Sequence, residues 1–372
     1  MKTLNKLLTF FVGATFIFSG AVKIIDPKGT AIKLEEYFYV FAADVADSFP
    51  ALESLFTELM PYALVISVVL STMEVVLGAA LLTNFYKKVT LRLLLLLLAF
   101  FGFLTFYSAY FNRVTDCGCF GDFIKFSPWG SFTKDMILLT ASLLLLIHPS
   151  SKDNFKTPLG GIFTFLATAA SLSVGIYAIR HLPPIDFRVY AVGANIPELM
   201  QPAEQCEYLY IMEKDGETVE MKQYPTDPSY KYKEMRILNE EACKPKITDY
   251  AVSSLEGDDV TQATLTGKSL LIIIHDTKKA DKTIWAGINE LCQDAKEAGI
   301  HPMILTSDAS GITNFAQQHN LTEDIYLSDA TVLKTMIRSN PGIILMEDGV
   351  VKGKWHYNDT PQIEEVGQLL IK

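Results

Sequence analysis

Two cysteines, Cys117 and Cys119, lie in the short segment DCGCFGD, which directly follows a long apolar stretch. The single glycine between them allows a strained disulfide, because glycine tolerates unusual backbone dihedrals. Strained disulfides have raised reduction potentials and exchange readily with other thiols. The pair is therefore the first candidate for chemistry, namely thiol–disulfide exchange with a substrate protein or electron relay to a membrane partner.

Two other interpretations of these cysteines stay open. Cys117 and Cys119 could form a static disulfide, within the loop or to another cysteine, that only shapes the segment. They could also bind a metal, but no histidine or further cysteine lies nearby at the spacing that zinc sites use. We therefore predict no metal site.

Glu74 is the second candidate, because it lies about midway along an apolar stretch of membrane-spanning length. A carboxyl group inside a bilayer is costly and usually faces the interior of a helix bundle, so it marks a candidate site. Lys23 and Asp135 lie near the ends of other apolar stretches and could pair with it if their depths match. The alternative is a structural polar contact between helices.

The other three cysteines lie in the C-terminal half. Cys206 and Cys243 bracket a predicted hairpin, and a disulfide between them would enclose 36 residues. By the loop-entropy estimate such a structural disulfide contributes about 3–4 kcal/mol. The alternative is a second exchanging pair. Cys292 lies in the middle of a predicted helix and is expected to be a buried thiol.

The elements that must position these residues begin with five apolar stretches, each near the length of about 20 residues that crosses a bilayer. They are Leu4–Ile25, Pro61–Thr83, Leu91–Phe111, Gly130–Ile147 and Gly160–Ile179. The fourth contains Lys134 and Asp135, so a re-entrant or interfacial segment is its alternative. A cleaved signal peptide is the alternative for the first, although no small-x-small cleavage site follows it.

Lys and Arg residues predict the orientation. Three clusters fall on one side if all five stretches cross: Lys2 and Lys6; Lys87, Lys88 and Arg92; Lys152 and Lys156. That side is predicted to be cytoplasmic. The N-terminus then lies in the cytoplasm, while the acidic loop from Asp26 to Met60, the DCGCFGD segment and everything after Arg180 lie in the periplasm. The predicted location is the inner membrane.

The charge of the C-terminal half limits its partners. From Arg180 onward the chain has 30 acidic and 19 basic residues, against a net charge of −10 for all 372 residues. An acidic outer part argues against nucleic acid as a partner, because nucleic-acid binding needs a basic surface. The expected partners are the lipid bilayer and an extracytoplasmic client or another membrane protein.

The C-terminal half predicts a mixed α/β fold. A proline-containing linker, Arg180 to Met200, leads to a hairpin that turns at Asp215-Gly216. The predicted strands after it are Leu270–His275, Met303–Thr306, Ile343–Met346 and Val350–Trp355. The predicted helices are Thr283–Ala298, Ile312–His319, a segment capped by Asp329 and ending at Arg338, and Gln362–Ile371.

This order of elements resembles a thioredoxin fold, and the segment SNPGIILMEDGVVKGKWHY resembles the part of thioredoxins in which a cis-proline precedes a hairpin. The resemblance implies that Pro341, preceded by Asn340, marks a peptide-binding groove. In redox-active members a C-x-x-C motif follows the first central strand. The matching stretch here, Asp276 to Asp281, has no cysteine. The resemblance thus implies a thioredoxin-like domain without the dithiol, which could still bind an extended peptide.

The first 150 or so residues resemble the DoxX/MauE group of four-helix membrane proteins. The resemblance rests on FSGAVKIIDP (Phe18 to Pro27), on Glu74 and Gly78, and on DCGCFGD. It implies thiol handling, since MauE is implicated in maturing a disulfide-rich periplasmic enzyme. The fusion to a thioredoxin-like tail resembles proteins of the Bacteroidetes type. Analogy with other four-helix disulfide-forming proteins suggests a quinone as electron acceptor, although no residue here requires one.

Together these observations predict an α-helical membrane bundle, four DoxX/MauE-like spans plus a fifth, followed by an α/β thioredoxin-like domain. The expected boundaries are 1–150 for the four-helix domain, 151–200 for the fifth helix and linker, and 201–372 for the outer domain. The predicted function is extracytoplasmic thiol–disulfide handling or protein maturation through Cys117 and Cys119. The alternative is a non-enzymatic scaffold or assembly subunit whose dithiol-free domain binds a partner protein.

Overall fold

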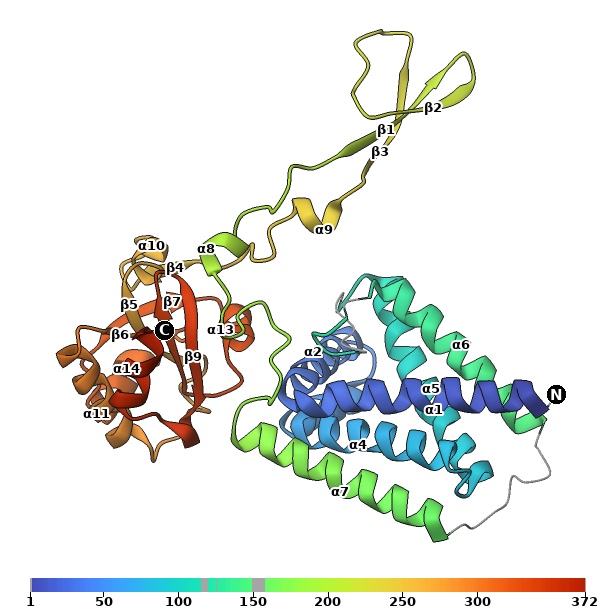
Figure 1. Cartoon of the computed structure of the whole chain (residues 1–372), viewed down its shortest axis with the longest axis horizontal. Helices are drawn as coiled ribbons and strands as arrows, with labels where there is room; N and C mark the ends of the chain where they lie inside the picture. The colour runs from blue at the N-terminus through green and yellow to red at the C-terminus, as the bar shows by residue number, and fades with distance from the viewer. Residues whose placement is uncertain (1, 115–119, 125, 149–157, 372) are drawn as a thin grey trace. The chain divides into compact units, whose positions relative to one another are not determined.

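The protein folds into two compact units, Met1–Phe187 and Arg188–Lys372. We call them the membrane unit and the α/β unit. The structure, a computed structural model, describes residues 2–114, 120–124, 126–148 and 158–371. Figure 1 shows helices throughout the first unit and strands only in the second.

Five helical segments of the membrane unit are long and apolar enough to cross a membrane, which confirms the predicted number. They correspond to α1 (Lys2–Ile25), α4 (Ala63–Leu82), α5 (Lys87–Phe111), α6 (Pro128–Ile147) and α7 (Pro158–Arg180). The segment before α4 is also helical, so the second candidate span runs from Pro50 to Leu82. Leucines of α4, α5 and α6 form the main core, with Val12 and Phe16 of α1 packed among them.

The stretch expected as the loop from Asp26 to Met60 is largely helical, so that expectation was wrong. It forms α2 (Pro27–Val45), α3 (Pro50–Leu59) and the short 3-10 helix η1 (Met60–Tyr62). Asp26 caps α2, because its carboxylate accepts from the backbone N–H of Gly29, and Pro27 occupies the first position. One face of α2 is buried, including Leu34, Tyr37 and Phe41.

The α/β unit contains a six-stranded mixed sheet in the order β4-β7-β6-β5-β8-β9. The strands are β4 (Val252–Ser254), β5 (Lys268–Ile274), β6 (His301–Thr306), β7 (Asp324–Ser328), β8 (Gly342–Glu347) and β9 (Val350–His356). Strand β5 is central: it runs parallel to β6 and antiparallel to β8, with Ile272 opposite Ile304 on one side and Ile343 on the other. Every residue of β5 after Lys268 is buried, as the apolar run predicted.

Helices and connections complete this unit. The longer helices are α11 (Trp285–Glu297), α12 (Ile312–His319), α13 (Ala330–Met336) and α14 (Ile363–Ile371), with short turns α8 (Ile196–Leu199), α9 (Glu240–Cys243), α10 (Thr261–Thr264) and η2 (Tyr357–Asp359). Trp285, Ile288 and Phe315 join strand residues in one core. Asp329 caps α13 as predicted, accepting from the N–H groups of Thr331 and Val332.

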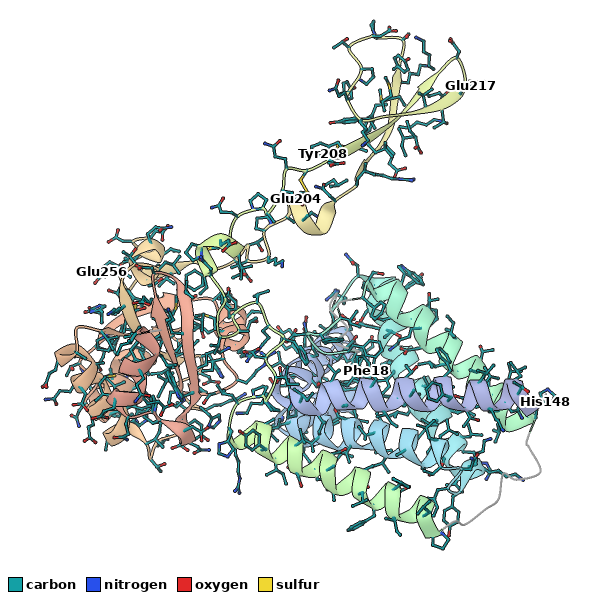
Figure 2. All side chains as sticks on the ribbon, viewed as in Figure 1. Phe18, His148, Glu204, Tyr208, Glu217 and Glu256 are labelled. Atoms are coloured by element: carbon teal, nitrogen blue, oxygen red, sulfur yellow. A yellow bond between two sulfur atoms is a disulfide. The ribbon has the colours of Figure 1, made fainter. Side chains whose placement is uncertain are left out.

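A separate three-stranded sheet, in the order β2-β1-β3, lies within residues 208–237. Strands β1 (Tyr208–Lys214) and β2 (Glu217–Met221) form the predicted hairpin around Asp215-Gly216, both of which have positive φ. Strand β3 (Lys231–Ile237) was not predicted, because six of its seven residues are exposed and no apolar alternation marks it. The disulfide Cys206–Cys243 joins the two chain segments that flank this sheet (Figure 2), with an S–S distance of 2.13 Å.

Candidate functional site

The site lies in the membrane unit, where glycines let α1 and α4 approach closely. A Cβ atom on Gly78 would lie 2.7 Å from the carbonyl oxygen of Gly13, and one on Gly20 would lie 2.7 Å from the carbonyl oxygen of Ser71. Real Cβ atoms do not approach backbone oxygen this closely, so these positions require glycine. The close packing brings side chains of α1 directly against Glu74 on α4.

A buried ion pair links the two helices. Lys23 Nζ on α1 donates to Glu74 Oε1 at 2.5 Å, and the two side chains are 7% and 1% exposed. The ammonium also lies 4.5 Å from the centre of the Phe101 ring on α5. Removing both charges from water costs several kcal/mol per ion, and only good geometry and further polar contacts offset it. Glu74 therefore faces the bundle interior, and of its two proposed partners the structure gives it Lys23.

A second polar group lies on α5 and α6. Asp135 is buried, and its carboxylate is 3.1 Å from Lys134 Nζ. Thr105 Oγ1 on α5 lies 3.1 Å from the other carboxylate oxygen of Asp135. From the sequence, Asp135 was expected to be at most a partner of Glu74, and Lys134 with Asp135 raised the alternative of a re-entrant segment. A carboxylate within an apolar stretch was already the signal of a polar site, as it was for Glu74.

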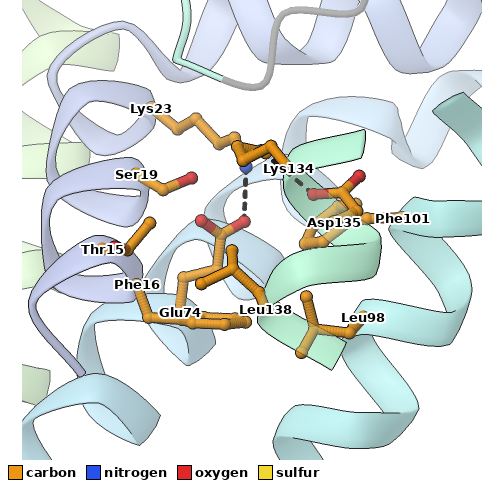
Figure 3. Close-up of a pocket in the computed structure, with 10 residues that line it drawn as sticks. All are labelled: Thr15, Phe16, Ser19, Lys23, Glu74, Leu98, Phe101, Lys134, Asp135 and Leu138. Carbon is orange, nitrogen blue, oxygen red and sulfur yellow. Dashed lines mark hydrogen bonds and ion pairs between the residues drawn. The ribbon is translucent and has the colours of Figure 1, made fainter. Parts of the chain in front are cut away.

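Two cavities meet at the Lys23–Glu74 pair. The first has about 310 Å³ of empty space and holds both polar groups, as Figure 3 shows: Lys23 and Glu74 lie opposite Lys134 and Asp135, with Phe16, Leu98 and Leu138 below them. The second, of about 510 Å³, is lined by residues of α1, α2, α4 and α5: Lys23, Thr30, Lys33, Leu34, Tyr37, Leu70, Ser71, Glu74, Phe101, Leu104 and Thr105. Lys23, Glu74 and Phe101 belong to both.

Phe120, the residue that directly follows Cys119, provides an anchor beside this site. Cys117 and Cys119 themselves lie outside the described residues. Phe120, the next residue, is buried; its ring packs against Phe18 of α1 at 5.5 Å, and Lys134 Nζ lies 4.8 Å from the ring centre. A Cβ on Gly121 would come within 3.3 Å of Val22 on α1. The anchor of the loop thus shares Lys134 with the buried polar site.

In the α/β unit the Asn340-Pro341 peptide bond is cis. Asn340 also holds the segment Asp276 to Asp281: its side-chain N–H donates to the carbonyl of Asp276 at 2.7 Å, and its own carbonyl accepts from Asp281 N–H at 3.2 Å. Cys292 is a buried free thiol on α11. Burial, and then the charge of Glu323, raise the pKa of Cys292 to about 12.

Within the described ranges, no group of three or more His, Cys, Asp or Glu side chains is arranged to hold a metal ion. The polar groups that line the two cavities are candidates to meet a bound organic molecule. They lie in the membrane unit and combine cations, carboxylates and hydroxyls with apolar walls.

A comparison with known protein families gives a match over the part of the chain that holds the two cavities. Residues 1–148 match a family model described as methylamine utilisation protein MauE. That range includes α1 to α6, both buried polar groups and the cysteine loop. No curated protein matches the chain.

Proposed function

We propose that residues 1–148, which match the MauE family model, form a membrane domain of that family, and that this protein handles thiols and disulfides outside the cytoplasmic membrane through Cys117 and Cys119. The family's description names methylamine utilisation, and the resemblance that we drew from the sequence connects it with maturation of a disulfide-rich enzyme. In this proposal the lysine and arginine pattern orients the loop and the α/β unit toward the periplasm. The α/β unit is a thioredoxin-like domain that presents a client.

The single observation that supports the proposal most is the anchor at Phe120. The residue directly after Cys119 is buried against α1 and lies beneath Lys134, whose neighbour Asp135 lines the same cavity as Lys23 and Glu74. In this proposal the anchor at Phe120 holds the cysteine segment close to the charged residues that line the cavity: Lys23, Glu74, Lys134 and Asp135. Charged groups near thiols set how much of the reactive thiolate is present.

The proposed reaction is an exchange of one disulfide for another. A thiolate of the client attacks the Cys117–Cys119 disulfide, giving a mixed disulfide and releasing one loop thiolate. The second client thiolate then attacks the client sulfur of the mixed disulfide. The client gains a disulfide and loses two protons and two electrons, which leave Cys117 and Cys119 as the dithiol. The reverse sequence would reduce a client.

The test is the redox state of the loop cysteines in intact cells. Free thiols are trapped with a mass-shifting alkylating reagent before, during and after a mild pulse of reductant, and the peptide with Cys117 and Cys119 is read by mass spectrometry. We expect a mixed population that shifts with reductant and recovers after its removal. A pair that stays fully oxidised or fully reduced throughout contradicts the proposal.

Cys292→Ser is the matched control for this experiment. Cys292 is 1% exposed and its pKa is raised to about 12, so almost none of it is thiolate near neutral pH. The variant should show the same cycle at Cys117 and Cys119 as the unaltered protein. A changed cycle would mean that the signal does not come from the loop.

One observation favours the scaffold function as a second candidate. The α/β unit has three cysteines, of which Cys206 and Cys243 are joined and Cys292 is buried. Asn340 and the segment Asp276 to Asp281 are already hydrogen-bonded to each other. The described residues of this unit therefore hold no pair of accessible free thiols, which is consistent with a domain that binds a partner protein. A scaffold should keep its cellular function in the Cys117→Ser/Cys119→Ser variant, whereas an exchanging protein should lose it.

A further inference from the structure

The hydrogen bonding of the Lys23 ammonium is incomplete within the described residues. An ammonium group has three N–H donors. One reaches Glu74 Oε1 at 2.5 Å, and the group also faces the Phe101 ring, which is a weaker cation–π contact. No other acceptor for it lies within hydrogen-bond distance among the described residues. Buried charges normally have their remaining donors satisfied, because an unmet donor forfeits its hydration without compensation.

A second donor without a partner lines the larger cavity. Ser71 on α4 is fully buried, and its hydroxyl has no hydrogen-bond partner among the described residues. Other hydroxyls of these helices instead donate to the carbonyl one turn earlier, as Thr15 does to Phe11 and Thr133 to Trp129. The cavity therefore combines the Lys23 ammonium with a hydroxyl that has no partner.

The surroundings define what could supply the missing acceptor. The walls of the cavity are largely apolar, with Leu34, Leu70, Phe101 and Leu104 around the ion pair, and they belong to helices of the membrane unit. The Lys23–Glu74 pair has no net charge, and Lys33, which lines the same cavity, is paired with Glu36 at 3.4 Å. The Glu74 carboxylate would repel an anion bound beside Lys23. A neutral molecule with an apolar body and a carbonyl oxygen fits both conditions.

We propose that the cavity between α1, α2, α4 and α5 binds a neutral, lipid-soluble molecule whose carbonyl oxygen accepts a hydrogen bond from Lys23 Nζ. An alkyl-substituted benzoquinone and the ester group of a phospholipid both present this chemistry. The proposal does not depend on the loop cysteines, so it is tested without a thiol assay, and its failure would leave the proposed thiol function unaffected.

The experiment measures binding to the full chain in detergent by native mass spectrometry with three probes. They are a decyl-substituted benzoquinone, a short-chain phosphatidylethanolamine, and decylbenzene, which has a ring and an alkyl chain but no carbonyl. We expect one carbonyl probe to bind at least tenfold more tightly than decylbenzene, and the preferred probe identifies the source of the ligand. Equal binding of all three would overturn the proposal, because water would then satisfy Lys23.

The variant Lys23→Met/Glu74→Met removes the donor without leaving an unpaired buried charge. Since a hydrogen bond to a charged group is worth about 1.5–3 kcal/mol, the carbonyl probe should bind about 10- to 150-fold more weakly. Binding of decylbenzene should stay the same. Ser142→Ala is the matched control, because Ser142 is equally buried and has no partner among the described residues, but lines neither cavity. Carbonyl binding that is unchanged in the Met variant would overturn the proposal.

A second measurement covers the case in which the Met variant does not fold. A photoreactive azidoquinone is cross-linked to the unaltered protein in membranes, and the labelled peptides are identified. Labels on α1, α4 and α5 around Lys23, Glu74 and Phe101 would support the site. Two results would overturn it. One is a set of labels confined to other helices, and the other is labelling that neither excess unlabelled quinone nor excess phospholipid reduces.

Discussion

At the scale of single residues, the most consequential feature is a charge pair that the membrane unit holds away from water. Lys23 and Glu74 are nearly inaccessible, and their contact at 2.5 Å offsets a desolvation cost of several kcal/mol for each ion. Such a pair contributes little net stability relative to well-packed apolar side chains. Its presence therefore favours a functional role, which we place in ligand binding at the two adjoining cavities.

This reasoning predicts an asymmetry between single and double substitutions. Lys23→Met leaves Glu74 charged and unpaired in the bundle, and we expect it to destabilise the membrane unit by about 3–5 kcal/mol. Lys23→Met/Glu74→Met removes both charges and should recover most of that loss. Thermal unfolding in detergent, followed by size-exclusion chromatography of the protein that remains monodisperse, measures both. Equal losses for the single and double variants would contradict the interpretation.

At the scale of secondary-structure elements, the spacing of helices α1 and α4 decides whether this pair can form. Gly13, Gly20 and Gly78 each lie where a Cβ would meet the opposite helix within 3.0 Å. Helix α2 closes the second cavity from another side, with Leu34 and Tyr37 in its wall. The site therefore depends on a segment that carries no obvious chemical signature of its own.

Gly78→Ala tests this dependence. The new methyl group would lie 2.7 Å from the backbone oxygen of Gly13, which cannot move as a flexible side chain can. We expect a loss of about 1–3 kcal/mol, typical of overpacking, together with weaker binding of the carbonyl probe. The readouts are thermal unfolding and native mass spectrometry.

Gly161→Ala, on α7, is the matched control for that substitution. Its Cβ would make ordinary van der Waals contact with the Phe85 ring at 3.4 Å, and alanine favours helix over glycine. This variant should be as stable as the unaltered protein or slightly more so. If both alanine variants behave alike, close packing of α1 on α4 is not what the site requires.

At the scale of the whole molecule, the chain joins a membrane unit to an α/β unit at residue 187. Five candidate spans are an odd number, so the two ends of the spanning region face opposite sides if every span crosses. The basic residues at the start of α1 and around the start of α5 then predict the cytoplasmic side. The α/β unit, with its disulfide, would lie where disulfides persist.

This orientation is tested with one new cysteine on each side. Lys88→Cys is placed near the start of α5 and Lys279→Cys in the segment after β5; both positions are exposed. Intact cells, with the outer membrane permeabilised, are treated with a membrane-impermeant maleimide, and labelled peptides are identified by mass spectrometry. We expect labelling of Lys279→Cys only, and labelling of Lys88→Cys only after the inner membrane is opened. The reverse pattern would overturn the orientation.

The sequence by itself determined the elements whose physical cause is local. Apolar runs of about 20 residues specify spans wherever they occur, the Asp215-Gly216 turn specifies a hairpin, and Asp329 specifies the start of α13, since each depends only on neighbouring residues. The sequence also indicated Glu74 as a candidate site residue, because a carboxylate in an apolar membrane span is costly in any fold. It did not find β3 or β7, whose short strands lack a regular buried pattern.

Only the tertiary structure decided which distant residues meet. Lys23 and Glu74 are 51 residues apart, and whether their depths match depends on how α1 packs on α4. Asp135 and Thr105 come together because α5 and α6 pack side by side, and α2 joins the site because its apolar face needs a partner. Contacts between elements arise from the complementary shapes of whole helices, which no local stretch of sequence encodes.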